Sequence, residues 1–159
     1  AALKRSVFSL LPFLSFGLLP SLATLSAPDP QVAAPWATAA GCAFGVAVHL
    51  TNVLPDLEAD QRTAVRGTPH LLGARASAVL AALAVVGGAI AVLLGPAAGS
   101  IAAINWLAWV FFGLVSACAV AALLLVLLRP PSRTPFRLMM MAALLLGVQL
   151  VATGGSLVG

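Results

Sequence analysis

The sequence predicts an all-α protein, a bundle of about five helices that cross a membrane. Of its 159 residues, 62% are hydrophobic and only 8% are charged, and the mean hydropathy is +1.11. This is more apolar surface than one small soluble core can bury, so lipid must surround most of the chain. The apolar residues also form long runs, with basic residues between alternate runs. We expect one transmembrane domain over residues 1–159.

Five apolar runs have the length of a membrane span, because a hydrocarbon core about 30 Å thick needs roughly 20 helical residues. Short segments rich in Pro, Gly and charge separate the runs, which cover 6–25, 35–54, 76–94, 101–128 and 135–158. The fourth run would reach roughly 42 Å at about 1.5 Å per residue. We expect it to tilt, or to begin in the interface near Asn105, Trp106 and Trp109.

All Lys and Arg residues fall on one side of this predicted membrane. They are Lys4, Arg5, Arg62, Arg66, Arg75, Arg129, Arg133 and Arg137. Because positively charged connections are retained in the cytoplasm, we expect these segments there and the C-terminus outside, in a multi-pass protein of a bacterial inner membrane. The opposite connections carry only Asp29. The net charge of +4 then reflects topology and predicts no nucleic-acid site.

Two interpretations of the N-terminus compete. Lys4 and Arg5, the apolar run and the small residues Ser26 and Ala27 are typical of a secretory signal peptide. The run is longer than the roughly 7 to 15 apolar residues of such peptides, which favours a membrane span. The lack of an initiator Met predicts that residue 1 continues a longer protein.

Three of the four acids lie in the segment 56–60, directly after the second run. Asn52, Asp56 and Asp60 are spaced at i, i+4 and i+8, so on a helix continued from that run they share one face, whereas Glu58 points elsewhere. Two carboxylates one turn apart repel each other. The spacing therefore predicts a compensating positive group.

That positive group is either an arginine or a metal ion. Arg62 and Arg66 follow the acids closely and would also meet an anion. Carboxylate and amide oxygens suit Mg²⁺, which often bridges carboxylates to the phosphates of a substrate. The alternative is a solvated acidic cap paired with its own arginines. Pro55 interrupts the helical hydrogen bonding at the start of the segment and predicts a kink.

The pattern Asn-x-x-x-Asp-x-Glu-x-Asp at 52–60, followed by Arg66, Pro69 and Leu72-Gly73, resembles the second aspartate-rich motif of the UbiA superfamily of intramembrane prenyltransferases. The order of elements is also similar, with a span before the motif, a cytoplasmic motif loop at 55–75 and three spans after it. The resemblance extends to the first run with Leu3-Lys4-Arg5. It implies that the chain is the C-terminal half of a fold of about nine membrane helices.

This resemblance implies a Mg²⁺-dependent transferase that moves an isoprenoid chain from a prenyl pyrophosphate to an aromatic or other lipophilic acceptor. Asp56 and Asp60 would bind the metal and, with Arg66, act as the catalytic residues. The substrate-binding residues would be Asn52, Lys4 and Arg62. The family holds Mg²⁺ between two aspartate-rich motifs, so this chain would supply one half-site and the missing N-terminal spans of the same protein would supply the other.

Two departures from the family pattern affect the motif. Val53 stands where many members have Asp, and Ala64 where Gly is common. The alternatives from other functional classes are a non-catalytic membrane scaffold and a transporter fragment in which the acids form a cation vestibule. A transporter would be expected to carry ionisable residues within several spans and inverted repeats, and the sequence has neither.

Isolated polar residues within the runs predict structural roles. Gln149 lies in the middle of the fifth run and predicts an interhelical hydrogen bond, because an unpaired amide in lipid is costly. His49 is expected to be a buried, hydrogen-bonded residue rather than part of a cavity floor. Cys42 and Cys118 have no second metal-ligating residue at a suitable spacing, so we expect both to be small apolar residues buried in the bundle.

Overall fold

The computed structural model describes residues 2–53, 68–98, 100–129, 132–153 and 157–158, with the side chains of 2–10, 53, 68–72 and 153 excepted. This described part of the chain is helical and contains no strand. The helices are α1 (Ala2–Leu25), α2 (Pro35–Val53), α4 (Thr68–Leu94), the 3₁₀ turn η1 (Ile101–Ala103), α5 (Trp106–Leu128) and α6 (Thr134–Thr153). The predicted all-α fold class is confirmed to this extent.

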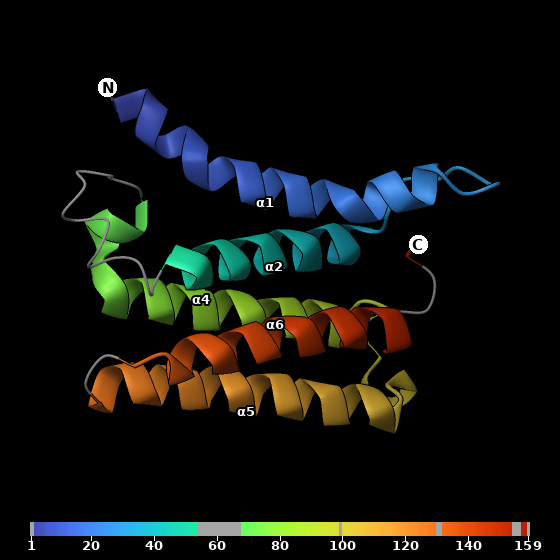
Figure 1. Ribbon diagram of the computed structural model, residues 1–159. Helices are drawn as coiled ribbons and strands as arrows, with labels where there is room; N and C mark the ends of the chain where they lie inside the picture. Colours follow the sequence, from blue (N-terminus) through green and yellow to red (C-terminus); the bar gives the residue numbers. More distant parts are fainter. Residues whose placement is uncertain (1, 54–67, 99, 130–131, 154–156, 159) are drawn as a thin grey trace.

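The helices lie side by side as one bundle (Figure 1). α1 forms one edge and packs almost entirely on α2, whereas α2 also packs on α4. α5 forms the opposite edge and contacts α4 and α6, and α6 reaches both α4 and α2. Successive helices therefore run in opposite directions, as the short connections between the predicted spans require.

Three helical segments are long and apolar enough to cross a membrane: Gly73–Leu94, Trp106–Leu128 and Thr134–Ala152. Leu11–Leu25, the part of α1 whose side chains are described, is a shorter apolar helix. α2 is a helix over the predicted second span, but His49, Thr51 and Asn52 make its last turns less apolar. A membrane-embedded helical protein is thus supported, while the number of five spans stays a prediction.

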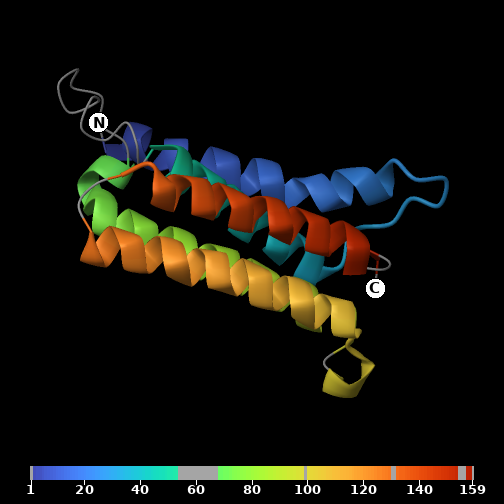
Figure 2. The same ribbon diagram turned by 60° about the horizontal axis from the view of Figure 1, so that its bottom comes forward.

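Three predicted boundaries differ from the structure. The helix of the fourth run begins at Trp106 instead of residue 101, because the Asn105 side chain accepts a 2.9 Å hydrogen bond from the Leu107 N–H and caps α5. A start near Trp106 was one of the two expectations for this long run. η1 is a separate turn that projects beyond the start of α5 (Figure 2). α4 begins at Thr68, so the last part of the predicted motif loop is helical. α6 ends at Thr153, and the Leu157 carbonyl accepts a 2.7 Å hydrogen bond from the Ala34 N–H.

Small residues fill the centre of the bundle, and large apolar residues face outward. Alanines in four helices are fully buried: Ala37, Ala47, Ala81, Ala89, Ala119 and Ala142. Leucines such as Leu83, Leu128 and Leu144 are at least 60% exposed. A water-soluble core shows the opposite arrangement, whereas helices in lipid associate by close packing of small side chains.

Candidate functional site at the polar end of the bundle

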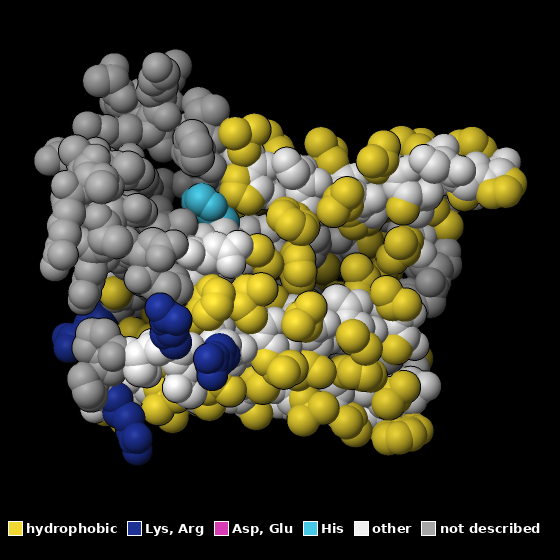
Figure 3. All heavy atoms as spheres, viewed as in Figure 1, with side chains coloured by type: hydrophobic (Ala, Val, Ile, Leu, Met, Phe, Trp, Pro, Cys, Tyr) yellow, Lys and Arg dark blue, Asp and Glu magenta, His cyan; other side chains and the backbone are white. Residues whose placement is uncertain are grey.

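The bundle has one end at which the described arginines gather. α1, α4 and α6 begin at this end, and α2 and α5 finish there (Figure 1). The dark blue side chains in Figure 3 lie at the same end, and they belong to exposed arginines: Arg75, Arg129, Arg133 and Arg137. Asp29 lies in the α1–α2 connection at the other end, where Gln31 donates a 2.9 Å hydrogen bond to its carboxylate. We call the arginine-bearing end the polar end.

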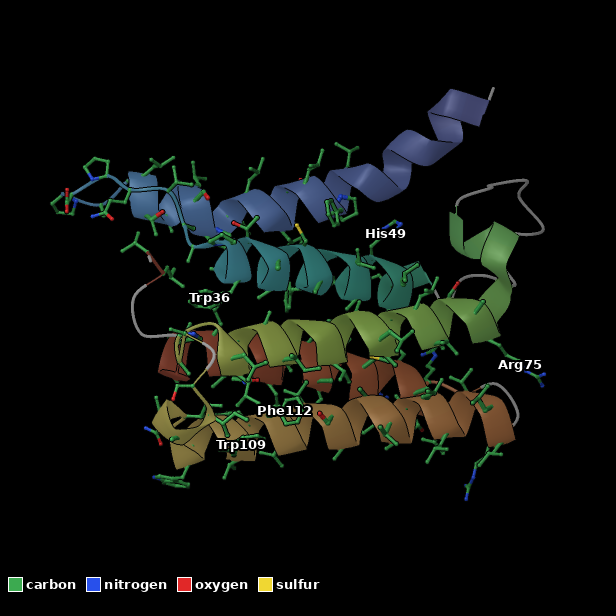
Figure 4. The ribbon with its side chains drawn as sticks, turned by 180° about the vertical axis from the view of Figure 1, so that it is seen from behind. Trp36, His49, Arg75, Trp109 and Phe112 are labelled. Atoms are coloured by element: carbon green, nitrogen blue, oxygen red, sulfur yellow. The ribbon has the colours of Figure 1, made fainter. Side chains whose placement is uncertain are left out.

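The predicted site begins at the last turn of α2, which reaches the polar end. Asn52 is exposed there. His49 lies one turn earlier and projects from α2 toward α1 (Figure 4). It is half-buried, so the burial expected of this histidine is only partial. Cys42 and Cys118 are likewise only partly buried.

Most of the other predicted site residues lie outside the described residues. These are Asp56, Asp60, Arg62 and Arg66. Lys4 belongs to α1, which begins at the polar end, but its side chain is outside the described part. Among the side chains that the structure describes, no three of His, Cys, Asp and Glu lie close enough together to hold a metal ion. The geometry of the acidic face therefore stays a prediction.

A sharp backbone break at Gly73 follows the predicted motif. Its φ of 79° and ψ of 165° lie in a region that only glycine adopts readily. The first turn of α4 consequently leaves the direction of the rest of the helix (Figure 1). Arg75 comes two residues later and points away from the bundle (Figure 4). Gly73 belongs to the predicted motif, but the hydropathy and spacing around it do not predict this conformation.

Two buried hydroxyl groups lie just below the polar end. Thr51 is 1% exposed and Ser77 is fully buried, and neither side-chain oxygen has a hydrogen-bond partner in the described structure. A Cβ on Gly88 would contact Ala40 and Ala43, which sets the register of α4 against α2. Because the two helices run in opposite directions, this register puts Thr51 within about one turn of Ser77. A single hydroxyl within an apolar run gives no sign, by its spacing, of which residue it will meet. This pair was therefore not predicted from the sequence.

An apolar cavity of about 300 Å³ lies in the half of the bundle away from the polar end. α1, α2, α4 and α6 all contribute to its walls, which are almost entirely carbon. They include Phe16, Phe44, Val92, Leu146, Gly147 and Leu157. The Phe16 and Phe44 rings lie 5.3 Å apart between their centroids. We call this space the tail cavity because its lining suits hydrocarbon and, among the described residues, contains no charged side chain.

A second hollow of about 640 Å³ lies on another side of α2. Phe13, Thr38, Cys42, Val46 and Ala84 contribute to its lining, which is also predominantly apolar. Its walls come from α1, α2, α4 and the segment that leads into α2. Both sides of α2 are thus bordered by space that could accept an apolar group.

Comparison of the chain with protein-family models, with curated proteins and with solved structures gave no match. The functional assignment consequently depends on the residues themselves and on the arrangement of polar and apolar regions along α2. Asn52 follows Phe44 by eight residues and Ala40 by twelve. At about 1.5 Å per residue, the exposed amide lies roughly 12 to 18 Å along the helix from the tail cavity.

Proposed function

We propose that this chain is part of a Mg²⁺-dependent intramembrane prenyltransferase and supplies the second aspartate-rich half-site. The observation that carries the proposal is that one helix, α2, has a carbon-lined cavity beside its middle and the start of the acidic motif at its end. A prenyl pyrophosphate has a strongly charged head and a long hydrocarbon tail. The two regions of α2 match these two parts of the substrate.

In this proposal the residues of the polar end bind the head group. Asp56 and Asp60 would hold Mg²⁺, and Asn52 would add an amide contact on the same helical face. Mg²⁺, when bound, neutralises the charge that builds on the departing pyrophosphate. Arg62 and Arg66 would donate hydrogen bonds to phosphate oxygens, which guanidinium groups bind in pairs. Lys4 would approach the same anion from α1.

The apolar region would hold the tail and keep water from the reacting carbon. Ionisation of an allylic pyrophosphate leaves a positive charge on carbon, which water would quench by addition. A site without water lets a lipophilic acceptor capture that carbon instead. An electron-rich aromatic acceptor would need little help from a general base. A quinone precursor, a chlorophyll-type ring or a lipid would all suit such a cavity.

Replacing each aspartate of the acidic face by asparagine, in the membrane-embedded protein, tests the role of this face. Asp56→Asn and Asp60→Asn should each lower Mg²⁺-dependent release of pyrophosphate from allylic prenyl pyrophosphates by at least about 100-fold, the scale of losing a main electrostatic stabiliser. Glu58→Gln is the matched control, because helical spacing predicts that Glu58 points away from that face, and the turnover of this variant should change little. Unchanged turnover in the aspartate variants would exclude the assignment.

A binding measurement covers the case in which the other half-site limits turnover. Calorimetry with a prenyl pyrophosphate should show binding that needs Mg²⁺ and is lost in Asp56→Asn. If the wild-type protein binds the pyrophosphate equally well without a divalent ion, the metal role of this face is wrong.

The tail cavity is tested by filling it. Gly147 borders the cavity, and a Cβ added there would meet no atom within 4 Å, so Gly147→Leu should place a side chain in the space without overlap at its base. We expect poorer use of long prenyl donors with less effect on short ones. Gly113→Leu on α5 is the control, since that position is equally open but does not line the cavity. An identical chain-length profile for Gly147→Leu and the wild type would show that the tail lies elsewhere.

A further inference from the structure

Three arginines cluster where α5 ends and α6 begins. Arg129 caps α5, with its backbone N–H donating a 3.1 Å hydrogen bond to the Leu125 carbonyl. Arg133 immediately precedes α6, and its carbonyl accepts a 3.2 Å hydrogen bond from the Arg137 N–H. Arg133 and Arg137 are therefore one helical turn apart and share a face. We call these three exposed residues the arginine corner.

The arginine corner has no balancing charge among the described residues. Asp29 is the carboxylate whose side chain the structure describes, and it lies at the opposite end of the bundle. Two like charges one turn apart repel each other, so the pair on α6 favours a bound anion. The corner lies where α5, the edge helix of the bundle, is followed by α6 (Figure 1). Its anion is thus expected from the surroundings of the protein.

Exposed hydrocarbon begins directly beside the guanidinium groups. Leu128 precedes Arg129 and is 77% exposed, and Met141 follows Arg137 by one turn and is 51% exposed. Leu144, a further turn along α6, is 60% exposed. Figure 3 shows the dark blue side chains next to the yellow apolar surface. A ligand at this place meets cations at one end and an apolar helix surface at the other.

We propose that the arginine corner binds an anionic phospholipid, with its phosphate on the arginines and its acyl chains along α5 and α6. A guanidinium fork matches phosphate oxygens in pairs, and the apolar surface beside it accepts the chains. A zwitterionic lipid would bring its own ammonium group toward the same cations. A soluble anion would leave the apolar surface unused. The site is separate from the proposed transferase site and does not depend on it.

Lipid retention by the intact protein tests this inference. Native mass spectrometry would follow the protein in mixed micelles with equal amounts of phosphatidylglycerol and phosphatidylcholine that have the same acyl chains. We expect the wild-type protein to retain phosphatidylglycerol preferentially. In Arg133→Gln/Arg137→Gln, the ratio of retained phosphatidylglycerol to phosphatidylcholine should fall about fivefold for each arginine removed. Arg133→Lys/Arg137→Lys keeps the charge but loses the paired guanidinium hydrogen bonds, so it should retain more of the preference than the glutamine variant and less than the wild type. It also shows that these positions tolerate substitution.

Arg75→Gln is the matched control, because Arg75 is exposed at the same end but belongs to α4. Loss of the preference in Arg75→Gln to the same degree would show only a diffuse basic surface and would overturn the proposal. Equal retention of the two lipids by the wild type would overturn it as well. So would displacement of the lipid by inorganic phosphate beyond the effect of chloride at equal ionic strength, since the corner would then bind a free anion.

Discussion

α2 packs against α1 on one side and against α4 on the other, and glycines allow close contact on both sides. The atoms that approach these glycines are mainly backbone atoms on the α1 side and mainly side-chain atoms on the α4 side. On the α1 side, a Cβ on Gly41 would overlap the Phe16 carbonyl oxygen, and one on Gly45 would overlap the Pro12 carbonyl oxygen. On the α4 side, a Cβ on Gly88 would lie 3.0 Å from Cδ2 of Leu146 on α6, 3.2 Å from Cβ of Ala43 and 3.6 Å from the Ala40 carbonyl oxygen. Its tightest neighbour is therefore a side chain, and the backbone atom is at an ordinary contact distance. A leucine side chain can rotate away, whereas a helix backbone cannot.

The two contacts therefore differ in how much change they tolerate. The α1–α2 contact is a backbone-to-backbone approach of the small-xxx-small kind, made by Gly41 and Gly45 one turn apart. α1 has almost no other neighbour, so losing this contact would detach it from the bundle. The α4 side shares its burial among α2, α5 and α6, so a local misfit is absorbed by several side chains.

The largest effect is expected for Gly41→Ala. The new methyl group would push α1 away from α2, and we expect a loss of about 3 kcal/mol in unfolding free energy, at the upper end for overpacking. Denaturant-dependent loss of helical circular dichroism in mixed micelles would measure it. Gly113→Ala is the control on α5, where an added Cβ meets nothing within 4 Å. Equal stabilities of the two variants would mean that α1 and α2 are not in backbone contact.

A disulfide test detects the same contact directly. A Cβ on Gly17 would lie 3.7 Å from Cβ of Cys42, inside the range of about 3.5 to 4.5 Å found in disulfides. Gly17→Cys should therefore cross-link α1 to α2 under mild oxidation once the Cys42 thiol rotates. Proteolysis between the two helices followed by non-reducing electrophoresis would show the link. Its persistence in Gly17→Cys/Cys42→Ser, through Cys118 instead, would contradict the observed packing.

Gly73→Ala separates backbone strain from crowding. Nothing lies within 4 Å of a Cβ at this position, so any loss comes from the φ of 79° alone. We expect a loss of about 1 to 2 kcal/mol, measured as above. Gly87→Ala is the control, because it is an equally open glycine in regular helix and should gain up to about 1 kcal/mol. A gain in both variants would show that α4 has no break at Gly73.

The sequence predicted the helices well because run length and hydropathy report directly on burial in lipid. The errors lie at helix ends, where local geometry decides. Asn105 caps the N-terminus of α5, so this helix begins later than the fourth run, and Gly73 lets helical residues precede the third span. Neither effect changes the hydropathy of the run in which it occurs. The hydrogen bond predicted for Gln149 is confirmed, because an amide in the middle of a span has few other ways to be satisfied.

The candidate site was predictable only in part. Spacing alone predicts that Asn52, Asp56 and Asp60 share one face, since helical periodicity is a property of sequence, and this stays a prediction because Asp56 and Asp60 lie outside the described residues. The tail cavity depends on how four helices leave space between them, and no single run contains that information. The buried hydroxyls of Thr51 and Ser77 likewise become notable only when their helices are brought together.

Gln149→Met tests the interhelical hydrogen bond between α6 and α4, which pack together on the α4 side of α2. Gln149 is fully buried on α6, and its Nε2 donates a 3.4 Å hydrogen bond to the Ala89 carbonyl of α4. Methionine has a similar shape but no donor, so we expect a loss of roughly 0.6 kcal/mol, the average for such bonds between membrane helices. Leu150→Met on the same helix controls for the flexible side chain. A more stable Gln149→Met would mean that burying the amide costs more than its hydrogen bonding returns.

Gly88→Ala should have the smallest effect, within about 0.5 kcal/mol of wild type, even though Gly88 is buried where α2, α4 and α6 meet. Alanine favours the helix by up to about 1 kcal/mol over glycine, while Leu146 and, less so, Ala43 must shift by a few tenths of an ångström. The difference between Gly88→Ala and Gly87→Ala isolates the packing cost, because the two residues are adjacent and have the same helix preference. That difference should be smaller than the loss in Gly41→Ala. If it were as large, Leu146 would be as immovable as the α1 backbone, and the two sides of α2 would be equally strict.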